Sequence, residues 1–213
     1  MLSKLQRIQL DRYIELNPNE LSADQITKLK KEVNNPCSDF ICDESVDFKL
    51  WTMGYPSRQE SFAKYLVKKI TNNKKLKILE VGCGRTGRLA RILSKEGLWV
   101  TGIDPKVEIE EQENVKFIKE KFEYTTFDVS SYDFVIAQEP CDATEHIVRA
   151  CIEKRVPFII SLCGTPHKLL SGNMPKTYQE WYNYLLGISR ENMKLRYISL
   201  DPLTITPILR SIF

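Results

Sequence analysis

The chain has 213 residues, of which 42% are hydrophobic and 28% charged, so it fits one globular domain with an extension and is not a largely disordered chain. Its 31 basic and 28 acidic residues leave a formal net charge of +3, too small to indicate a nucleic-acid partner by charge alone. No apolar run approaches the roughly 20 residues that span a bilayer. No apolar leader follows Met1. We therefore expect a cytoplasmic protein with no membrane partner, and nothing in the composition indicates DNA. The six dispersed cysteines are expected to be free thiols.

The first part of the chain is predicted to be helical. Residues 1–16 and 22–33 carry apolar residues at helical spacing, and Ser22 with Gln25 forms a capping box at the start of the second helix. Residues 36–56 follow neither period and are predicted to be irregular. We expect residues 1–56 to form an N-terminal helical cap, followed by a core domain of residues 57–213.

The core domain is predicted to alternate strands with helices. A second capping box, Ser57 with Glu60, begins a helix that ends at Ile70. Strands are then expected at 76–81, 98–103, 115–118, 132–137, 157–162, 195–200 and 203–213, and helices at 88–96, 143–153 and 177–189. This alternation predicts an α/β fold with a doubly wound, mostly parallel, seven-stranded sheet. The last two strands are joined by a turn too short for a parallel crossover, so one of them is expected to be antiparallel.

The most informative motif is a glycine turn between the first strand of the core and the next helix. The residues Gly82-Cys83-Gly84-Arg85-Thr86-Gly87 allow the backbone to approach a ligand closely at a helix N-terminus. Asp104 ends the next strand, where a carboxylate can accept both hydroxyls of a ribose. Glu80 precedes the turn, where it would repel a pyrophosphate and attract a cationic amino group. The alternatives are a tight turn without a ligand and the site of an NAD-dependent oxidoreductase.

These residues resemble the class I S-adenosylmethionine-dependent methyltransferases. The stretch Glu80–Gly84 is similar to their first motif and Gly102–Pro105 to their second, and the resemblance covers about residues 57–165. It implies an enzyme that transfers a methyl group from S-adenosylmethionine to an acceptor. The fold and the antiparallel final strand of that family agree with the elements predicted above.

The resemblance also implies the residues that hold the cofactor. The glycine turn would line the cofactor, Asp104 would bind its ribose, and Glu80 would face its aminoacyl end. Arg58 suits the cofactor's carboxylate. The predicted set of cofactor-binding residues is Glu80, Gly82, Cys83, Gly84, Asp104, Pro105, Arg58 and Gln138. Glu120 and Phe122 are the candidates for the adenine contact, and Trp51 either closes over the cofactor or anchors the cap.

The acceptor is expected past the ends of the fourth and fifth strands, where this architecture places its catalytic groups. Glu139 and His167 are the catalytic candidates. Glu139 either orients or deprotonates an acceptor amine or hydroxyl, or caps the following helix. The stretch Pro140–Glu145 is similar to a methyltransferase subgroup that includes RNA ribose methyltransferases. The acceptor is thus a small molecule or RNA, and a non-catalytic methyltransferase-like binding subunit is a further alternative.

The cysteines permit two interpretations, a metal site and free thiols. The metal site would combine Cys37 and Cys42 with Cys141, Cys163 or His167. The four-residue gap between Cys37 and Cys42 is looser than most zinc spacings, and no second close pair exists in the sequence. The sequence therefore favours free cysteines and no metal.

Overall fold

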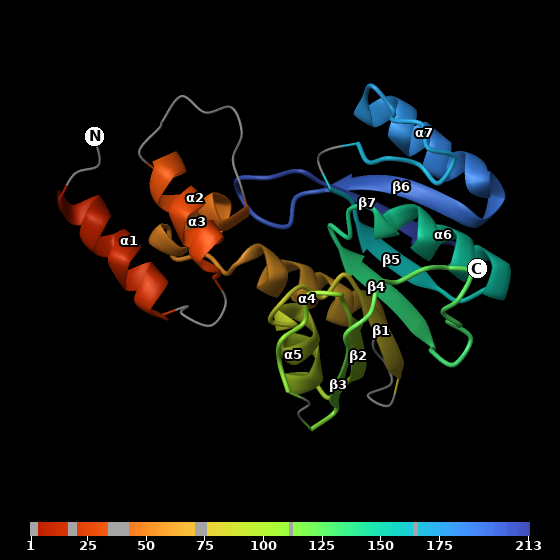
Figure 1. Ribbon diagram of the computed structural model, residues 1–213, viewed down its shortest axis with the longest axis horizontal. Coiled ribbons are helices and arrows are strands. Elements are labelled where there is room, and N and C mark those ends of the chain that lie inside the picture. Colours follow the sequence, from red (N-terminus) through yellow and green to blue (C-terminus); the bar gives the residue numbers. More distant parts are fainter. Residues whose placement is uncertain (1–3, 17–20, 34–42, 71–75, 111–112, 164–165) are drawn as a thin grey trace.

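The computed structural model describes residues 4–16, 21–33, 43–70, 76–110, 113–163 and 166–213 (Figure 1). Helices α1 (Lys4–Leu16), α2 (Ala23–Val33) and α3 (Asp43–Thr52) gather to one side of a central sheet. Both predicted capping boxes are formed. The backbone N–H of Ser22 donates to Gln25 Oε1 at 2.7 Å, and that of Ser57 donates to Glu60 Oε2 at 2.7 Å. These contacts satisfy backbone donors that the first turn of a helix leaves unpaired.

Helix α3 corrects the prediction that residues 36–56 are irregular; residues 36–42 lie outside the described part of the chain. In α3 the consecutive residues Val46, Asp47 and Phe48 are all buried, as is Leu50. A helix enclosed on several sides shows no single apolar stripe, so the 3.6-residue period that marks a surface helix is missing. Tyr13, Phe48 and Trp51 pack ring against ring at centroid distances of 5.6–6.4 Å and join α1 to α3.

Seven strands of the described chain form one sheet in the order β3-β2-β1-β4-β5-β7-β6. The strands are β1 (Lys77–Val81), β2 (Trp99–Ile103), β3 (Val115–Ile118), β4 (Phe134–Gln138), β5 (Phe158–Ser161), β6 (Met193–Ile198) and β7 (Thr206–Ser211). The first five are parallel, while β7 lies between β5 and β6 and runs antiparallel to both. This confirms the doubly wound fold and the antiparallel last strand that the sequence predicts.

Four helices cover the two faces of this sheet. They are α4 (Arg58–Ile70), α5 (Arg88–Lys95), α6 (Ala143–Lys154) and α7 (Tyr178–Ile188), and a short 3-10 helix, Arg190–Asn192, precedes β6. Ile78 packs with α4 and α5, whereas its neighbour Leu79 packs with α6 and α7, because successive strand residues point to opposite faces. Each fully buried aliphatic side chain contributes about 1.5–3 kcal/mol to folding.

The connections fix where a ligand can bind. After β1 the chain passes to α5 on one face, and after β4 it passes to α6 on the other (Figure 1). β1 and β4 are neighbours in the sheet, so the chain leaves the two strands in opposite directions and opens a crevice beyond their carboxyl ends. The glycine turn after β1 lies at this crevice.

Candidate functional site

Hydrogen bonds to the residues at the end of β2 hold the glycine turn in place. The backbone N–H of Gly82 donates to the Ile103 carbonyl at 2.9 Å, and that of Gly84 donates to Asp104 Oδ2 at 3.0 Å. Gly82 and Gly84 have φ angles of 75° and 69°, a region that favours glycine. A Cβ at Gly82 would lie 3.3 Å from the Pro140 backbone, whereas a Cβ at Gly84 would meet no protein atom within 4 Å. Gly84 therefore faces open space.

The third glycine of the motif has a packing role. Gly87 is the N-cap of α5, with a φ of 52°, and the ring of Phe117 on β3 occupies the place that a Cβ would take. Gly87 thus allows α5 to start close against β3.

A cavity of about 300 Å³ lies over the turn and is lined from both parts of the chain. The cap contributes Tyr13, Leu21, Gln25 and Asp47. The core contributes the turn itself and residues of the β1, β4 and β5 ends. Six of the predicted cofactor residues line it: Glu80, Gly82, Cys83, Gly84, Arg58 and Gln138. Gln59 and Asp47 also line it and were not predicted, because α3 was not recognised and nothing in their spacing distinguishes them.

Glu80 is a buried titratable group that lines this cavity. Only 3% of the residue is exposed, and Oε2 is buried with no hydrogen-bond partner among the described residues. Burial raises the pKa of Glu80 to about 8; Asp104 adds to the rise, and a hydrogen bond from the Ala90 backbone opposes it. Burial, with Glu80 and Asp104 close by, also raises the pKa of the Cys83 thiol. An orphaned carboxylate oxygen in a cavity fits a cationic group, because a buried charge needs a partner.

Gln138 at the end of β4 has a second buried, unpaired oxygen in the described part of the chain. Its Oε1 is buried without a hydrogen-bond partner in the described chain, and the residue lines the same cavity. Buried polar atoms are nearly always paired in folded proteins. The two unpaired oxygens of Glu80 and Gln138 therefore mark the place where a polar ligand would bind.

Asp104 and Pro105 lie just outside the lining of the cavity. Asp104 Oδ1 accepts the backbone N–H of Lys106 at 2.7 Å, while Oδ2 holds Gly84. Each carboxylate oxygen has a second lone pair that can accept a hydrogen bond from a ribose hydroxyl. Ribose binding by Asp104 remains a prediction. Phe122 is buried in the core and Glu120 is exposed. Neither of these two candidates for the adenine contact lines the cavity.

Arg58 and Glu139 face each other across the cavity and form an ion pair. Their side chains are 14% and 17% exposed. Arg58 is also held from the cap, because its backbone N–H donates to Asp47 Oδ1 at 2.9 Å. The partner of Glu139 is thus Arg58 rather than the N-terminus of α6, where Asp142 is the N-cap residue. The geometry therefore favours a Glu139 side chain that faces the cavity over one that caps α6.

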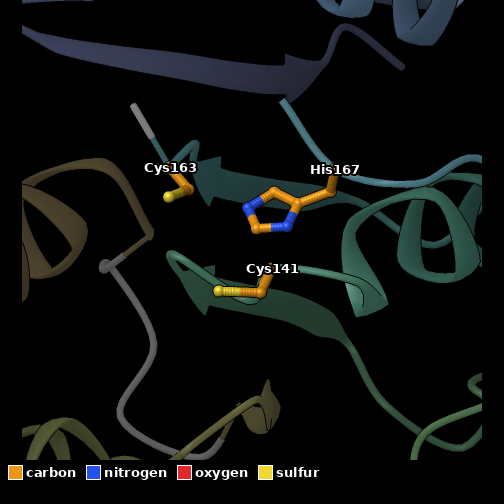
Figure 2. A group of neighbouring side chains, drawn as sticks. All are labelled: Cys141, Cys163 and His167. Atoms are coloured by element: carbon orange, nitrogen blue, oxygen red, sulfur yellow. The ribbon is translucent and has the colours of Figure 1, made fainter. Parts of the chain in front are cut away.

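Cys141, Cys163 and His167 come together from the loops after β4 and β5 (Figure 2). Their ligating atoms lie within 4.8 Å of one another. Cys141, like Glu139, is a non-glycine residue with a positive φ, 51°. The pKa of His167 lies above its usual range, because the adjacent Cys163 raises it first and Asp142 adds to this, while burial opposes. Cys37 and Cys42, the other cysteines of the metal site that the sequence disfavours, lie outside the described residues.

The fold and the cavity define an α/β protein with a ligand site at the switch point of a doubly wound sheet. Residues 79–155 match the protein-family model described as "Methyltransferase domain". A comparison with curated proteins found no relative by sequence. In the described residues, no helix combines the length and the apolar character needed to cross a membrane.

Solved structures share the fold at low sequence identity. A chain from the complex between the Haloferax volcanii Trm112 methyltransferase activator and a methyltransferase is 14% identical, with a TM-score of 0.54, over 79% of this chain and 94% of that one. Magnesium protoporphyrin IX methyltransferase from Synechocystis, solved with S-adenosylhomocysteine, is 16% identical, with a TM-score of 0.49, over 87% and 93%. The 1,6-didemethyltoxoflavin-N1-methyltransferase of Burkholderia thailandensis is 17% identical, with a TM-score of 0.48, over 90% of each chain.

The strand order and the glycine turn agree with the match of residues 79–155 to a methyltransferase domain. The resemblance read from Glu80–Gly84 and Gly102–Pro105 is confirmed. The site residues themselves are positioned by the geometry described above, and their individual roles are proposals.

Proposed function

We propose that the chain transfers the methyl group of S-adenosylmethionine to a nucleophilic atom of an acceptor that enters beside the loops after β4 and β5. The observation that carries the proposal is the buried Glu80 carboxylate, which has an unpaired oxygen next to the glycine turn. A cationic amino group supplies the missing partner, whereas the pyrophosphate of NAD would be repelled. The cofactor supplies a methyl group on a positively charged sulfur, which makes the methyl carbon electrophilic.

The residues of the chain bind and orient the reactants. Gly84 leaves room for the cofactor, Glu80 pairs with its amino group, and Asp104 accepts its ribose hydroxyls through the lone pairs that the turn leaves open. Methyl transfer is an in-line displacement, so alignment of donor and acceptor supplies much of the rate. Glu139, held by Arg58, is placed to orient an acceptor amine or hydroxyl and to receive its proton.

The first choice for the acceptor is a small molecule. Tyr13, Leu21 and Gln25 of the cap line the cavity, which limits the room beside the cofactor. RNA is the second candidate, since Arg85 and Arg88 border the same cavity. Binding of bulk tRNA with a steep dependence on salt would favour RNA, because counterion release dominates such binding. A cytoplasmic location also remains a prediction from the sequence.

The test is calorimetric titration of the full chain with S-adenosylhomocysteine, with NAD as the comparison ligand. We expect micromolar binding of the first and none of the second. Glu80→Gln should weaken S-adenosylhomocysteine binding by about 10- to 100-fold, the worth of one charge-assisted hydrogen bond. Glu153→Gln is the matched control, because Glu153 is an exposed carboxylate on α6. Equal affinities in the two variants would remove Glu80 from the site.

Two outcomes would redirect the proposal. Binding of NAD in place of S-adenosylhomocysteine would move the chain to the oxidoreductases. Binding of S-adenosylhomocysteine without turnover on any acceptor, together with a co-purifying protein, would favour the non-catalytic subunit.

Asp104→Ala should weaken cofactor binding by about 1.5–3 kcal/mol. Unchanged affinity in that variant would show that Asp104 only holds the turn.

A further inference from the structure

We propose that Cys141, Cys163 and His167 form a zinc site with one open coordination position beside the methyl-transfer cavity. The three residues come from two loops that parallel strands bring to the same edge of the sheet (Figure 2). Cys141 follows β4 and Cys163 follows β5, while His167 returns from the far side of the β5 loop. The sequence favours free thiols because it shows only the spacing along the chain, and this cluster arises from the pairing of β4 with β5.

The distances suit a tetrahedral ion after a small adjustment. Zinc–sulfur bonds of about 2.3 Å and zinc–nitrogen bonds of about 2.0 Å place tetrahedral ligand atoms about 3.5–3.8 Å apart. The sulfurs of Cys141 and Cys163 and a ring nitrogen of His167 already lie within 4.8 Å of one another. The difference of about 1 Å is small enough for changes in side-chain torsion angles to close when an ion binds.

His167 is oriented as a metal ligand would be. Its Nδ1 lies 3.4 Å from Asp142 Oδ1, its Nε2 is buried, and the side chain of Cys163 interacts with the ring. In Figure 2 the ring points towards the side on which both sulfurs lie. A carboxylate behind a histidine fixes the tautomer whose other nitrogen carries the lone pair, the arrangement usual at zinc sites.

The cluster is also held in place by packing. The ring of His167 contacts that of Trp181 on α7 edge to face, at a centroid distance of 5.4 Å. The buried Glu145 on α6 accepts the backbone N–H of Leu170 at 2.8 Å, which ties the loop of His167 to the helix that follows Cys141. The positive φ of Cys141 is a further constraint, since such conformations persist only where the surrounding structure enforces them.

The donor set and the surroundings indicate the metal and its role. Two thiolates and one imidazole are ligands that zinc prefers, and three protein ligands leave the fourth position of a tetrahedral ion open. Cys141 and Cys163 both line the cavity of about 300 Å³, so the open position faces it. When zinc binds, the two thiols give up their protons to solvent and the imidazole stays neutral.

The open coordination position of the zinc ion gives the metal site a role in the proposed methyl transfer. An acceptor hydroxyl or thiol bound to zinc would give up its proton to Glu139 more readily and become a better nucleophile. It would then take the methyl group, while the electron pair of the broken carbon–sulfur bond stays on the cofactor as a thioether. This task rests on the proposed methyl transfer, whereas the zinc site itself does not.

The experiment is a metal titration of the full chain, reduced and stripped with a chelator. Cobalt is added first and zinc second, in the absence of cofactor. We expect one cobalt ion per chain, with sulfur-to-cobalt charge-transfer bands and the absorption of a tetrahedral ion, displaced by one equivalent of zinc. Cys141→Ser, Cys163→Ser and His167→Gln should each lower zinc affinity by at least tenfold. Asp142→Asn, on an exposed side chain, should lower it by about tenfold through the orientation of His167.

Matched controls separate the site from general effects. Cys151→Ala and His146→Gln replace the same residue types on α6, away from the cluster, and should leave zinc affinity unchanged. Absence of thiolate-to-cobalt bands would overturn the proposal, as would unchanged affinity in Cys141→Ser and Cys163→Ser. A Cys141–Cys163 disulfide in anaerobically purified protein would overturn it too. Zinc binding without binding of S-adenosylhomocysteine would support the metal site and reject the proposed function.

Discussion

Glu80 couples ligand binding to a proton, because burial raises its pKa to about 8. At pH 7 the free protein therefore holds the carboxyl mostly protonated, and a cationic amino group binds the ionised form. Asp104 and the Cys83 thiol are the titratable groups beside it. Binding of S-adenosylhomocysteine at pH 6.5–7 should release close to one proton, so the affinity should rise with pH, by up to about tenfold per unit, until pH approaches 8.

The measurement for this prediction is calorimetry in two buffers of different ionisation enthalpy. The difference between the two observed heats gives the number of protons released. Glu80→Gln cannot release a proton and serves as the control. Equal heats in the two buffers for the unsubstituted protein would show that Glu80 is already ionised or does not meet the ligand.

Gly84 and Gly172 form a matched pair that separates ligand contact from backbone strain. Both have a positive φ, 69° and 85°, and a Cβ at either would meet no protein atom within 4 Å. Gly84→Ala and Gly172→Ala should therefore both lose about 1 kcal/mol of stability from the strained backbone. Only Gly84→Ala should also weaken S-adenosylhomocysteine binding, by tenfold or more, because its new methyl enters the cavity. Similar affinity in both variants would place the cofactor away from Gly84.

At the scale of single residues, the sequence predicts the positions of the ligand site better than the contacts made there. Glu80, Gly82 and Gly84 follow from a strand, a turn and a helix in succession. The pairing of Arg58 with Glu139 does not, because the two residues are 81 positions apart in the chain and meet only in the folded structure. The unpaired oxygens of Glu80 and Gln138 likewise depend on burial, which one sequence does not show.

Helices α6 and α7 are joined by the carboxylate of Glu145, whose side chain is 4% exposed. It accepts hydrogen bonds from Arg149 Nε at 2.8 Å, from the Tyr184 hydroxyl at 2.7 Å and from the Leu170 backbone. Burial by itself would raise the pKa of Glu145, but these bonds lower it below its usual value. Glu145→Ala should lower the free energy of unfolding by about 1–3 kcal/mol, because it removes the buried carboxylate that three partly buried donors share.

Urea unfolding followed by circular dichroism measures this loss. Glu153→Ala, an exposed neighbour on the same helix, should cost less than about 0.5 kcal/mol. Since the pKa of Glu145 is lowered by folding, its contribution is present above the usual carboxyl pKa and is lost as pH falls through the lowered value. The difference between the unsubstituted protein and Glu145→Ala should therefore shrink in acid. An equal loss in both variants would show that the Glu145 contacts do not stabilise the fold.

The elements themselves were predictable where their patterns were local. The parallel strands are short apolar runs, and the capping boxes at Ser22 and Ser57 begin their helices as the sequence indicates. Helix α3 was missed because Val46, Asp47 and Phe48 are all buried, which erases the periodicity that marks a helix. Predicted strand 203–213 is shorter in the structure, Thr206–Ser211, since Asp201 folds the preceding residues into a turn through Leu203 and Thr204.

At the scale of the whole molecule, Arg58 at the start of α4 connects the cap with the loop after β4. The Arg58 backbone is held by Asp47 of the cap, and its side chain pairs with Glu139 after β4. A double-mutant cycle of Arg58→Ala and Glu139→Ala should give a coupling free energy of about 1–3 kcal/mol, because both side chains are mostly buried. Denaturant unfolding of the four proteins measures it. Additive effects would mean that the ion pair does not stabilise the fold.

The placement of β7 has a consequence for how the chain is made. β6 is synthesised before β7, yet β7 lies between β6 and β5 in the finished sheet. Until β7 is available, β5 has an unpaired edge and β6 has no strand to pair with. Unpaired edges of this kind promote association between chains. A nascent chain that stalls before residue 206 would thus expose the aggregation-prone edge of β5. Completion of β7 protects the newly made protein from aggregation.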